Sequence, residues 1–140
     1  METNIQVLSG NKMKVELDGK EIGLIQNWRP NDSYGLDPAS GIGDIHVIEH
    51  VPTIARHTFT VEWMILNANN AYQHEIIPEN GDAALKGLVF DATAYSKDDD
   101  QRILRKYLSC SYDSGSINFT KHAIIVSDAT FHALDVTGQM

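Results

Sequence analysis

Polar and apolar residues alternate with a period of two over most of this chain, and no other feature limits the possible folds as strongly. The pattern is typical of β-strands that bury one face. It is most regular in residues 56–66, where one face carries five residues: His57, Phe59, Val61, Trp63 and Ile65. The other face carries Arg56, Thr58, Thr60, Glu62 and Met64. We therefore expect residues 56–66 to form a central strand.

A first hairpin is predicted near the N-terminus. Residues 12–18 alternate between apolar and charged side chains, and Asp18-Gly19 follows them directly. An Asp-Gly pair supplies the left-handed torsions that a tight hairpin turn requires. We expect residues 21–29 to form the return strand.

Further strands are predicted in the second half of the chain. Residues 86–95 and 103–112 read as a second hairpin, and the acidic run at 96–100 between them is interpreted as a solvated turn. This run lacks the spaced ligands and the glycine of a calcium-binding loop. Residues 117–119 and 123–134 complete the set of predicted strands.

One short helix is expected at residues 68–77, where Asn67 can cap the first turn and Pro78 ends the helix. About seven strands with one short helix predict a mainly β fold, an antiparallel β-barrel or β-sandwich with one flanking helix. The edges of such sheets can be satisfied by pairing with a neighbouring subunit in a ring.

Composition narrows the class of function. The chain has 140 residues, which suits a single domain spanning 1–140, and its 11 basic against 19 acidic residues give a net charge of −8. Tight nucleic-acid binding depends on Lys and Arg contacts with phosphates, so this balance argues against it. Cys110 is the single cysteine, which excludes an internal disulfide, and its strand-like surroundings predict a half-buried residue rather than a catalytic thiol.

The chain carries no signal of export or membrane insertion. Its first residues lack the charged and then apolar design of a signal peptide, and no window approaches eighteen consecutive apolar residues. We expect a soluble protein that is made in a cytoplasm and has no membrane partner.

A long loop and an extended arm are predicted between the first hairpin and the central strand. Residues 31–43 are rich in Pro, Gly, Asp and Ser, and the aliphatic-rich run 42–54 follows at once. Loops of this length in small domains are commonly functional. We interpret the whole segment, about residues 31–56, as an extended arm.

The arm contains a motif with two incompatible interpretations. His46, Glu49 and His50 form H-x-x-E-H, a zinc-peptidase signature when it lies on a helix. On a strand at roughly 3.3 Å per residue the two His α-carbons are about 13 Å apart, too far to share one zinc ion. Flanking glycines, Pro52 and the β-branched residues between them favour the strand, so we expect no metal, cofactor or catalytic site.

Several segments together resemble the tail tube proteins of contractile-tailed bacteriophages, which are related to the tube proteins of type VI secretion systems and R-type pyocins. The resemblance covers roughly residues 12–138. It rests on the order of these segments: DGKEIGLIQNWRP, YGLDPASGIGDIHVIEHVPT, RHTFTVEWMIL, GLVFDATAY and SGSINFTKHAIIVSDATFHALDVTG. It implies a structural virion protein that forms homohexameric rings, stacked into a channel for genome ejection.

The resemblance also implies partners and a location. The partners are other copies of the chain, the tail sheath, the baseplate hub, the tape measure and the tail terminator, with DNA only in transit. The protein would be found in the virion tail, after assembly in the cytoplasm of the bacterial host. A short baseplate ring, a secretion-system tube and a metal-dependent hydrolase using the H-x-x-E-H motif remain as alternatives.

Candidate contact and lumen residues follow from the resemblance. The arm would contact the next ring through six exposed aliphatic residues: Ile42, Ile45, Val47, Ile48, Val51 and Ile54. The lumen would be net negative, and five acids are candidates to line it: Glu16, Asp18, Glu21, Glu62 and Asp91.

Overall fold

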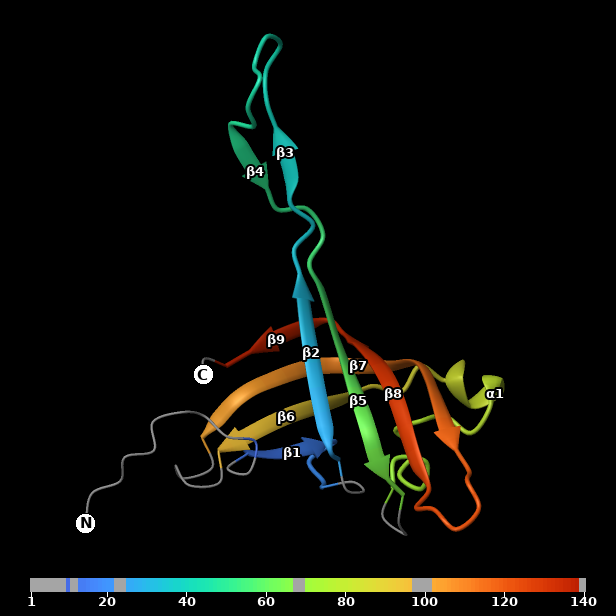
Figure 1. The fold of residues 1–140 in the computed structure, drawn as a ribbon. Coiled ribbons are helices and arrows are strands. Elements are labelled where there is room, and N and C mark those ends of the chain that lie inside the picture. Colours follow the sequence, from blue (N-terminus) through green and yellow to red (C-terminus); the bar gives the residue numbers. More distant parts are fainter. Residues whose placement is uncertain (1–9, 11–12, 22–24, 67–69, 97–101, 139–140) are drawn as a thin grey trace, which may run out of the picture.

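A curled antiparallel sheet and a narrow arm that projects from it make up the protein (Figure 1). The computed structural model describes residues 10, 13–21, 25–66, 70–96 and 102–138. The sheet has the strand order β1-β6-β7-β8-β5-β2, and β9 pairs with β7 beside this path. Its strands are β1 (Met13–Leu17), β2 (Asn27–Ser33), β5 (Arg56–Ile65), β6 (Phe90–Ser96), β7 (Ile103–Asn118), β8 (Val126–Ala133) and β9 (Asp135–Thr137). The predicted mainly β, antiparallel fold is confirmed.

The long strand β7 gives the sheet its curl. Its first half pairs with β6 and β9, and its second half pairs with β8 from Ser111 opposite His132 onward. Between the halves Ser109 has a positive φ of 53°, and its backbone NH donates to Asp91 Oδ1 at 3.0 Å. An irregularity of this kind bends a strand and increases its twist. The result is a half-barrel whose concave side holds the core.

Aromatic side chains dominate this core. Phe59 and Phe131 stack with ring centroids 5.1 Å apart, and Phe90 meets Phe131 edge-on at 5.2 Å. Trp28 meets Tyr107 edge-on at 5.7 Å. These pairs connect β2, β5, β6, β7 and β8, so both halves of the curled sheet share one apolar cluster. Cys110 is fully buried in this cluster rather than half-buried as predicted.

The central strand matches its predicted pattern only as far as Val61. His57, Phe59 and Val61 are buried as the alternation requires, but Trp63 is 65% exposed and Met64 is buried. The pairing of β5 with β8 shifts between Val61 and Met64, where Trp63 has a φ of 53° and its NH donates to Asp128 Oδ1. This bulge adds one residue and reverses the faces beyond it. The prediction that Trp63 shares the face of Phe59 was therefore wrong.

The first predicted hairpin was only half correct. Asp18 and Gly19 have positive φ angles of 56° and 73° and form the expected tight turn after β1. However, β1 pairs with β6, and β2 pairs with β5 along its whole length. Residues 22–24 of the expected return strand lie outside the described residues. β1 and β2 do not pair with each other, because each of them forms a longer pairing with another strand, β6 and β5 respectively.

The predicted helix at residues 68–77 was wrong where the structure describes it. Ala71 O accepts from both Ile76 N and Ile77 N, and Glu75 has a φ of 62°, so residues 71–77 form turns. Asn67 and Ala68 lie outside the described residues. The helix is instead α1 (Gly81–Ala84), where Asn80 Oδ1 accepts from Ala83 N at 3.0 Å.

The remaining strand predictions differ from the structure mainly in their bounds. The second hairpin is confirmed as β6 and β7, with Phe90 opposite Cys110 and Tyr95 opposite Ile103. Its acidic connection, residues 97–101, lies outside the described residues. The predicted strands 103–112 and 117–119 belong to one strand, β7, which continues to Asn118.

Candidate assembly surfaces

The arm is a two-stranded hairpin that stands well clear of the body (Figure 1). β3 (Asp37–Ala39) pairs with β4 (Glu49–Val51), and Asp37 lies opposite Val51. The tip is closed by Asp44, whose NH donates to Gly41 O and whose Oδ2 accepts from Gly41 N. The sequence predicted an extended arm here, and the structure adds that its two halves pair with each other.

The neck of the arm requires a glycine. Gly35 has a φ of 55°, and a Cβ there would lie 2.6 Å from Thr53 Oγ1. Thr53 N donates to Tyr34 O and to Gly35 O at 3.0 Å and 3.2 Å. The left-handed φ and the close contact with Thr53 together favour glycine at this position over a residue with a Cβ.

A hydrogen-bonded network anchors the foot of the arm. Asp32, near the end of β2, has Oδ1 2.6 Å from His57 Nδ1 on β5, and its Oδ2 accepts from Arg105 Nη2 on β7 at 2.8 Å. Tyr107 Oη donates to the same carboxylate at 3.3 Å. Burial raises the pKa of Asp32, but the hydrogen bonds from His57, Arg105 and Tyr107 outweigh it, so the pKa lies below its usual value.

Sequence reasoning missed this network, although one signal for it was present. His57 stands among Phe59 and Val61 on an apolar face and is 4% exposed. A buried imidazole requires a hydrogen-bond partner. The search for that partner leads to the acids of the neighbouring strand, and Asp32 lies opposite His57 in the register of β2 and β5.

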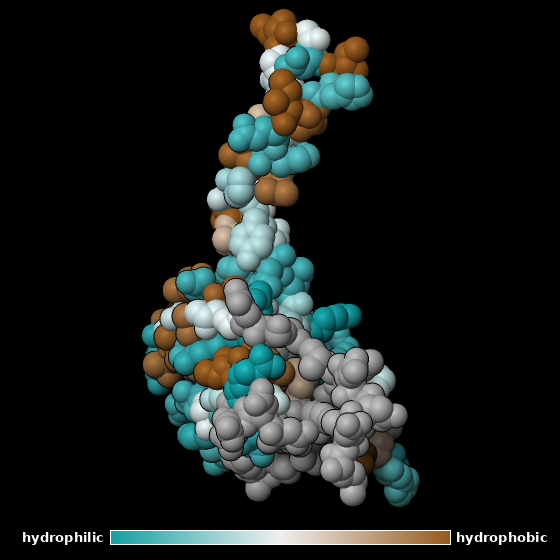
Figure 2. Space-filling view, turned by 90° about the vertical axis from the view of Figure 1, so that its left-hand side faces the viewer, coloured by the Kyte–Doolittle hydropathy of each residue, from teal (hydrophilic) through white to brown (hydrophobic). Residues whose placement is uncertain are grey.

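The six aliphatic residues predicted for the arm contacts are all exposed on the single chain. Ile42 and Ile45 at the tip are the most exposed, and Val47, Ile48, Val51 and Ile54 continue the apolar surface toward the body. Figure 2 shows hydrophobic residues along the arm up to its tip. Exposed apolar side chains in such density mark an interaction surface or an aggregation liability.

The H-x-x-E-H residues do not form the helical zinc arrangement. Glu49 and His50 lie on β4, and His46 precedes that strand in the bend of the tip. All three side chains are exposed. Among the described residues, no cluster of three or more His, Cys, Asp or Glu is placed to hold a metal ion.

Four of the five lumen candidates lie near the turn after β1, where Asp18 N donates to Asp91 O at 2.8 Å, and three of the five are paired with basic side chains. Glu16 pairs with Lys14 at 2.9 Å, Glu62 with Arg29 at 2.6 Å, and Asp91 with Lys106 at 3.9 Å. Asp18 lies in the exposed turn after β1, and Glu21 follows it. The pKa of Lys14 is raised mainly by its hydrogen bond with Glu16 and further by the charges of Glu16 and Glu21. Glu62 is separated from the others because it lies on β5.

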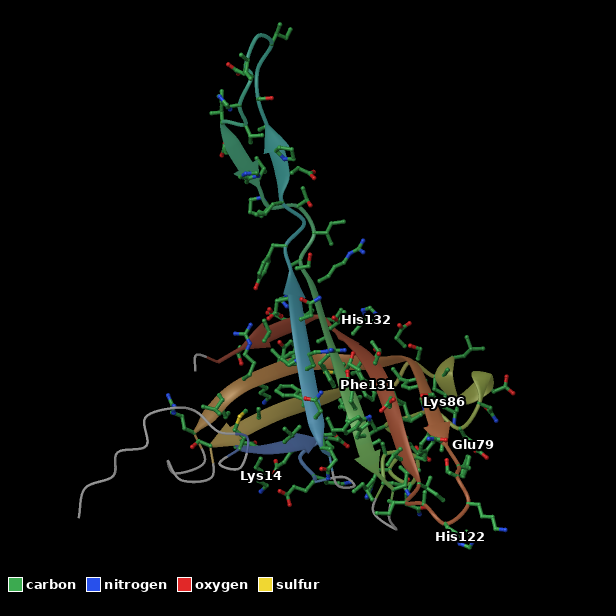
Figure 3. The ribbon with its side chains drawn as sticks, viewed as in Figure 1. Lys14, Glu79, Lys86, His122, Phe131 and His132 are labelled. Atoms are coloured by element: carbon green, nitrogen blue, oxygen red, sulfur yellow. The ribbon has the colours of Figure 1, made fainter. Side chains whose placement is uncertain are left out.

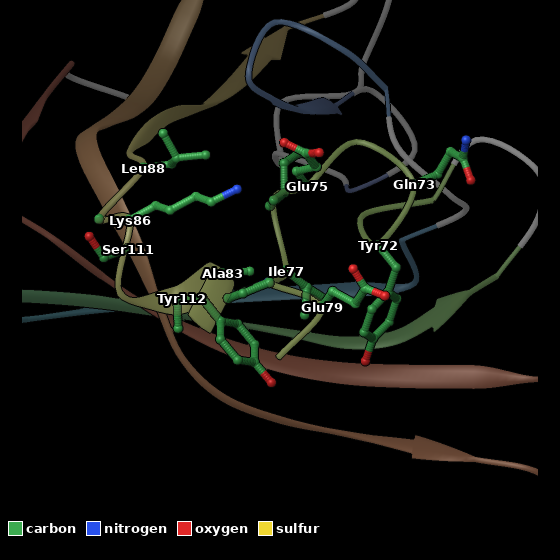
Figure 4. Close-up of a pocket in the computed structure, with 14 residues that line it drawn as sticks. Tyr72, Gln73, Glu75, Ile77, Glu79, Ala83, Lys86, Leu88, Ser111 and Tyr112 are labelled. Carbon is green, nitrogen blue, oxygen red and sulfur yellow. The ribbon is translucent and has the colours of Figure 1, made fainter. Parts of the chain in front are cut away.

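A pocket of about 480 Å³ lies between α1 and β7. Figure 4 shows Tyr72, Glu79, Lys86 and Tyr112 around it. Its lining mixes apolar residues with two carboxylates, Glu75 and Glu79. It contains no buried set of nucleophile and base, and it lies beside the body rather than on the arm.

The family model of the Phi812 tail tube protein matches residues 2–137. This chain belongs to that family. It is a structural subunit of a tail tube, as the resemblance implied, and the match covers both the body and the arm. No curated protein matches the sequence.

Solved structures show the same fold at low sequence identity. A chain from the tail of an empty gene transfer agent particle, computed with C6 symmetry, has a TM-score of 0.69 at 6% identity and covers 96% of this chain and 100% of its own. A chain from the sheath-tube complex of an extracellular contractile injection system has a TM-score of 0.65 at 14% identity, covering 94% and 90%. A chain from the anti-feeding prophage baseplate, 6-fold symmetrised, has a TM-score of 0.65 at 7% identity, covering 97% and 98%.

In the described part of this tail tube family member, no helix is long and apolar enough to cross a membrane. The family and the structural neighbours are tube proteins, which have structural roles.

Proposed function

We propose that this protein is the major tail tube subunit, which forms homohexameric rings that stack into a channel for genome ejection. The observation that carries this proposal is the arm, which extends an unpaired apolar surface away from a folded body in a chain of the tail tube family. The six-fold symmetry of the gene transfer agent tail and of the anti-feeding prophage baseplate supports the hexamer.

The stacking contact is assigned to the arm. Its exposed aliphatic residues gain roughly 1.5–3 kcal/mol each when they are fully buried. The arm projects from the body (Figure 1), so its tip reaches a neighbouring ring before the body does. The six contact residues predicted from the sequence, Ile42 to Ile54, are therefore kept as the inter-ring contacts.

Electron microscopy of the purified protein tests the ring and the tube together. We expect rings at low protein concentration and tubes of the same diameter at high concentration, and mass measurement should give six chains per ring. A species that remains monomeric over a wide concentration range, with neither rings nor tubes in micrographs, would contradict the proposal.

We also propose that the lumen of the tube is net negative and lets DNA pass without binding it. The chain carries eight excess acids, and a ring multiplies this charge around a narrow channel. Three of the five candidate acids are paired with Lys or Arg, and Glu21 interacts with the charge of Lys14, so Asp18, which forms no ion pair with another described residue, is the stronger candidate for unbalanced charge. DNA in transit would meet repulsion rather than a binding site.

Assembled tubes are expected to show no measurable affinity for duplex DNA at low salt, where phosphate attraction is strongest. Fluorescence anisotropy of labelled DNA measures this directly. The matched control is Asp18→Lys, which should bind DNA if Asp18 lines the channel. Micromolar binding by the unmodified tubes, weakening steeply as salt rises, would mean that basic residues line the lumen.

The proposed partners are the sheath, the tail terminator, the baseplate hub and the tape measure. Structural neighbours come from a sheath-tube complex, a sheath/tube terminator, a tube-terminating cap and a baseplate, which supports the first three. The proposed location is the virion tail, assembled in the host cytoplasm. The proposed role needs no catalytic activity, metal or cofactor.

A tube that moves proteins is the second candidate function. The similarity to a chain of an extracellular contractile injection system favours it. The two candidates differ in cargo: a tail tube joins a DNA-filled head, whereas an injection system carries protein. Recovery of the protein from particles, followed by analysis of their contents for DNA, separates them.

A further inference from the structure

We propose that the arm of one subunit binds a distal patch on a subunit of the next ring, formed by Phe119, Ile124 and Ile125 beside Lys121. The inference rests on the proposed stacking of rings and names the receptor for the arm. A contact between two different surfaces of the same chain repeats without closing, which is the geometry of an open-ended assembly.

The distal patch lies at the end of the body that is farthest from the arm. Residues 119–125 connect β7 to β8, and Figure 3 shows His122 of this loop at the end opposite the arm. Asn118 pairs with Val126, so Phe119 and Ile125 both flank the base of the loop. Phe119 is 72% exposed, Ile124 66% and Ile125 38%.

Charge favours the arm as the occupant of this patch. Residues 37–55 contain Asp37, Asp44 and Glu49 and no Lys or Arg. Residues 117–125 contain Lys121 and no acid, and Lys121 forms no ion pair with another described residue. An acidic apolar projection at one end thus matches a basic apolar surface at the other.

The pocket beside α1 is a weaker receptor for two reasons. Its lining carries two carboxylates, Glu75 and Glu79, against one amine, Lys86, so its net charge is negative and would repel the acids of the arm. Figure 3 also shows Glu79 and Lys86 at the side of the body, away from both ends. A subunit of the next ring would face this arm with an end of its body, whereas the pocket lies on the side of the body.

Disulfide cross-linking in assembled tubes tests the pairing. The full-length chain carries Ile42→Cys on the arm and Ile124→Cys on the distal patch, and tubes are oxidised with copper phenanthroline. Cys110 is fully buried, and burial raises the pKa of its thiol to about 12, so it does not compete. The control pairs Ile42→Cys with Leu88→Cys in the pocket beside α1.

The expected result is a non-reducing ladder that extends beyond six chains for the Ile124→Cys pair and is absent for the Leu88→Cys pair. Contacts that run from ring to ring are not limited by ring size, whereas a contact within a ring would stop the ladder at six. A ladder that ends at six, no ladder in intact tubes, or a ladder with Leu88→Cys instead would overturn the proposal. Absence of rings and tubes from the unmodified protein would instead contradict the proposed function.

Charge reversal gives an independent readout. Lys121→Glu is expected to raise the protein concentration needed for tubes by about tenfold or more, since weak ion pairs repeated around a ring act together. Rings should form as in the wild type, and added salt should reduce the difference. Lys86→Glu, in the pocket beside α1, should leave tube formation unchanged. Equal tube formation by Lys121→Glu and the wild type at low salt would show that the acidic arm does not dock beside Lys121.

Discussion

Replacement of Asp32 by alanine is expected to lower the free energy of unfolding by about 1–3 kcal/mol at neutral pH, the usual cost of leaving buried polar groups without a partner. His57 is almost fully buried and would lose the acceptor that lies 2.6 Å from its Nδ1. Arg105 and Tyr107 would lose the same carboxylate. Urea unfolding of the dispersed protein measures the change.

Asp37→Ala provides the matched control because it removes an exposed carboxylate from the arm. This substitution should change the free energy of unfolding by less than about 0.5 kcal/mol. Equal stability of the Asp32→Ala variant and the wild type would show that the network at the foot of the arm contributes nothing measurable.

The contribution of Asp32 should also depend on pH. Its folded-state pKa is lowered below the ordinary value of 3.8, because three hydrogen bonds to the carboxylate outweigh burial. A lowered folded pKa gives stability that is fully present above the unfolded pKa and is lost as pH falls through the folded pKa. The difference between the wild type and Asp32→Asn should therefore shrink in acid below pH about 4, and a constant difference from neutral pH to pH about 3 would argue against this origin.

The alternation of the sequence located most of the strands because it reports burial directly. It could not show which strands pair with each other, since any two amphipathic strands can bury their apolar faces equally well. The turn at Asp18-Gly19 was found from local torsional preference, yet β1 pairs with β6 and β2 with β5. Those partners are set by contacts between residues far apart in the chain.

The bulge at Trp63 shows a second limit of period-two reasoning. Nothing within residues 56–66 marks the extra residue, because the stabilising acceptor is Asp128 on β8. Its carboxylate receives the Trp63 NH that the bulge frees from the strand pairing. The helix prediction failed similarly: Ala71, Ile76 and Ile77 are buried, but their segment forms turns, and the spacing of its apolar residues was mistaken for helical periodicity.

The arm was predictable for the opposite reason. Its aliphatic residues do not keep a period of two, since Val47 and Ile48 are adjacent, and its glycines and prolines exclude a long regular element. An apolar run that cannot join the core has to be covered by something else. The network at the foot of the arm was harder to predict from the sequence, since Asp32 acquires its role only through Arg105 and Tyr107 on β7.

Replacement of residues 36–52 by Asn-Gly is expected to abolish tubes while rings still form. The structure supplies the splice point, because Thr53 N donates to Gly35 O at 3.2 Å and an Asn-Gly pair closes two antiparallel strands in a tight turn. The deletion removes Ile42, Ile45 and the other exposed aliphatic residues up to Val51. It leaves the network of Asp32 and the aromatic core intact, so the urea midpoint should stay close to that of the wild type.

Leu85→Ser is the control for loss of an exposed apolar residue away from the arm, and it should form tubes normally. The double variant Ile42→Ser with Ile45→Ser keeps the hairpin and should raise the concentration needed for tubes, because each aliphatic side chain loses roughly 1.5–3 kcal/mol of burial in the contact. Electron microscopy and sedimentation measure all three variants. Normal tubes from the shortened chain would place the inter-ring contact elsewhere on the body. Loss of rings as well as tubes would mean that the arm contacts neighbours within a ring, since the shortened chain retains every strand of the body.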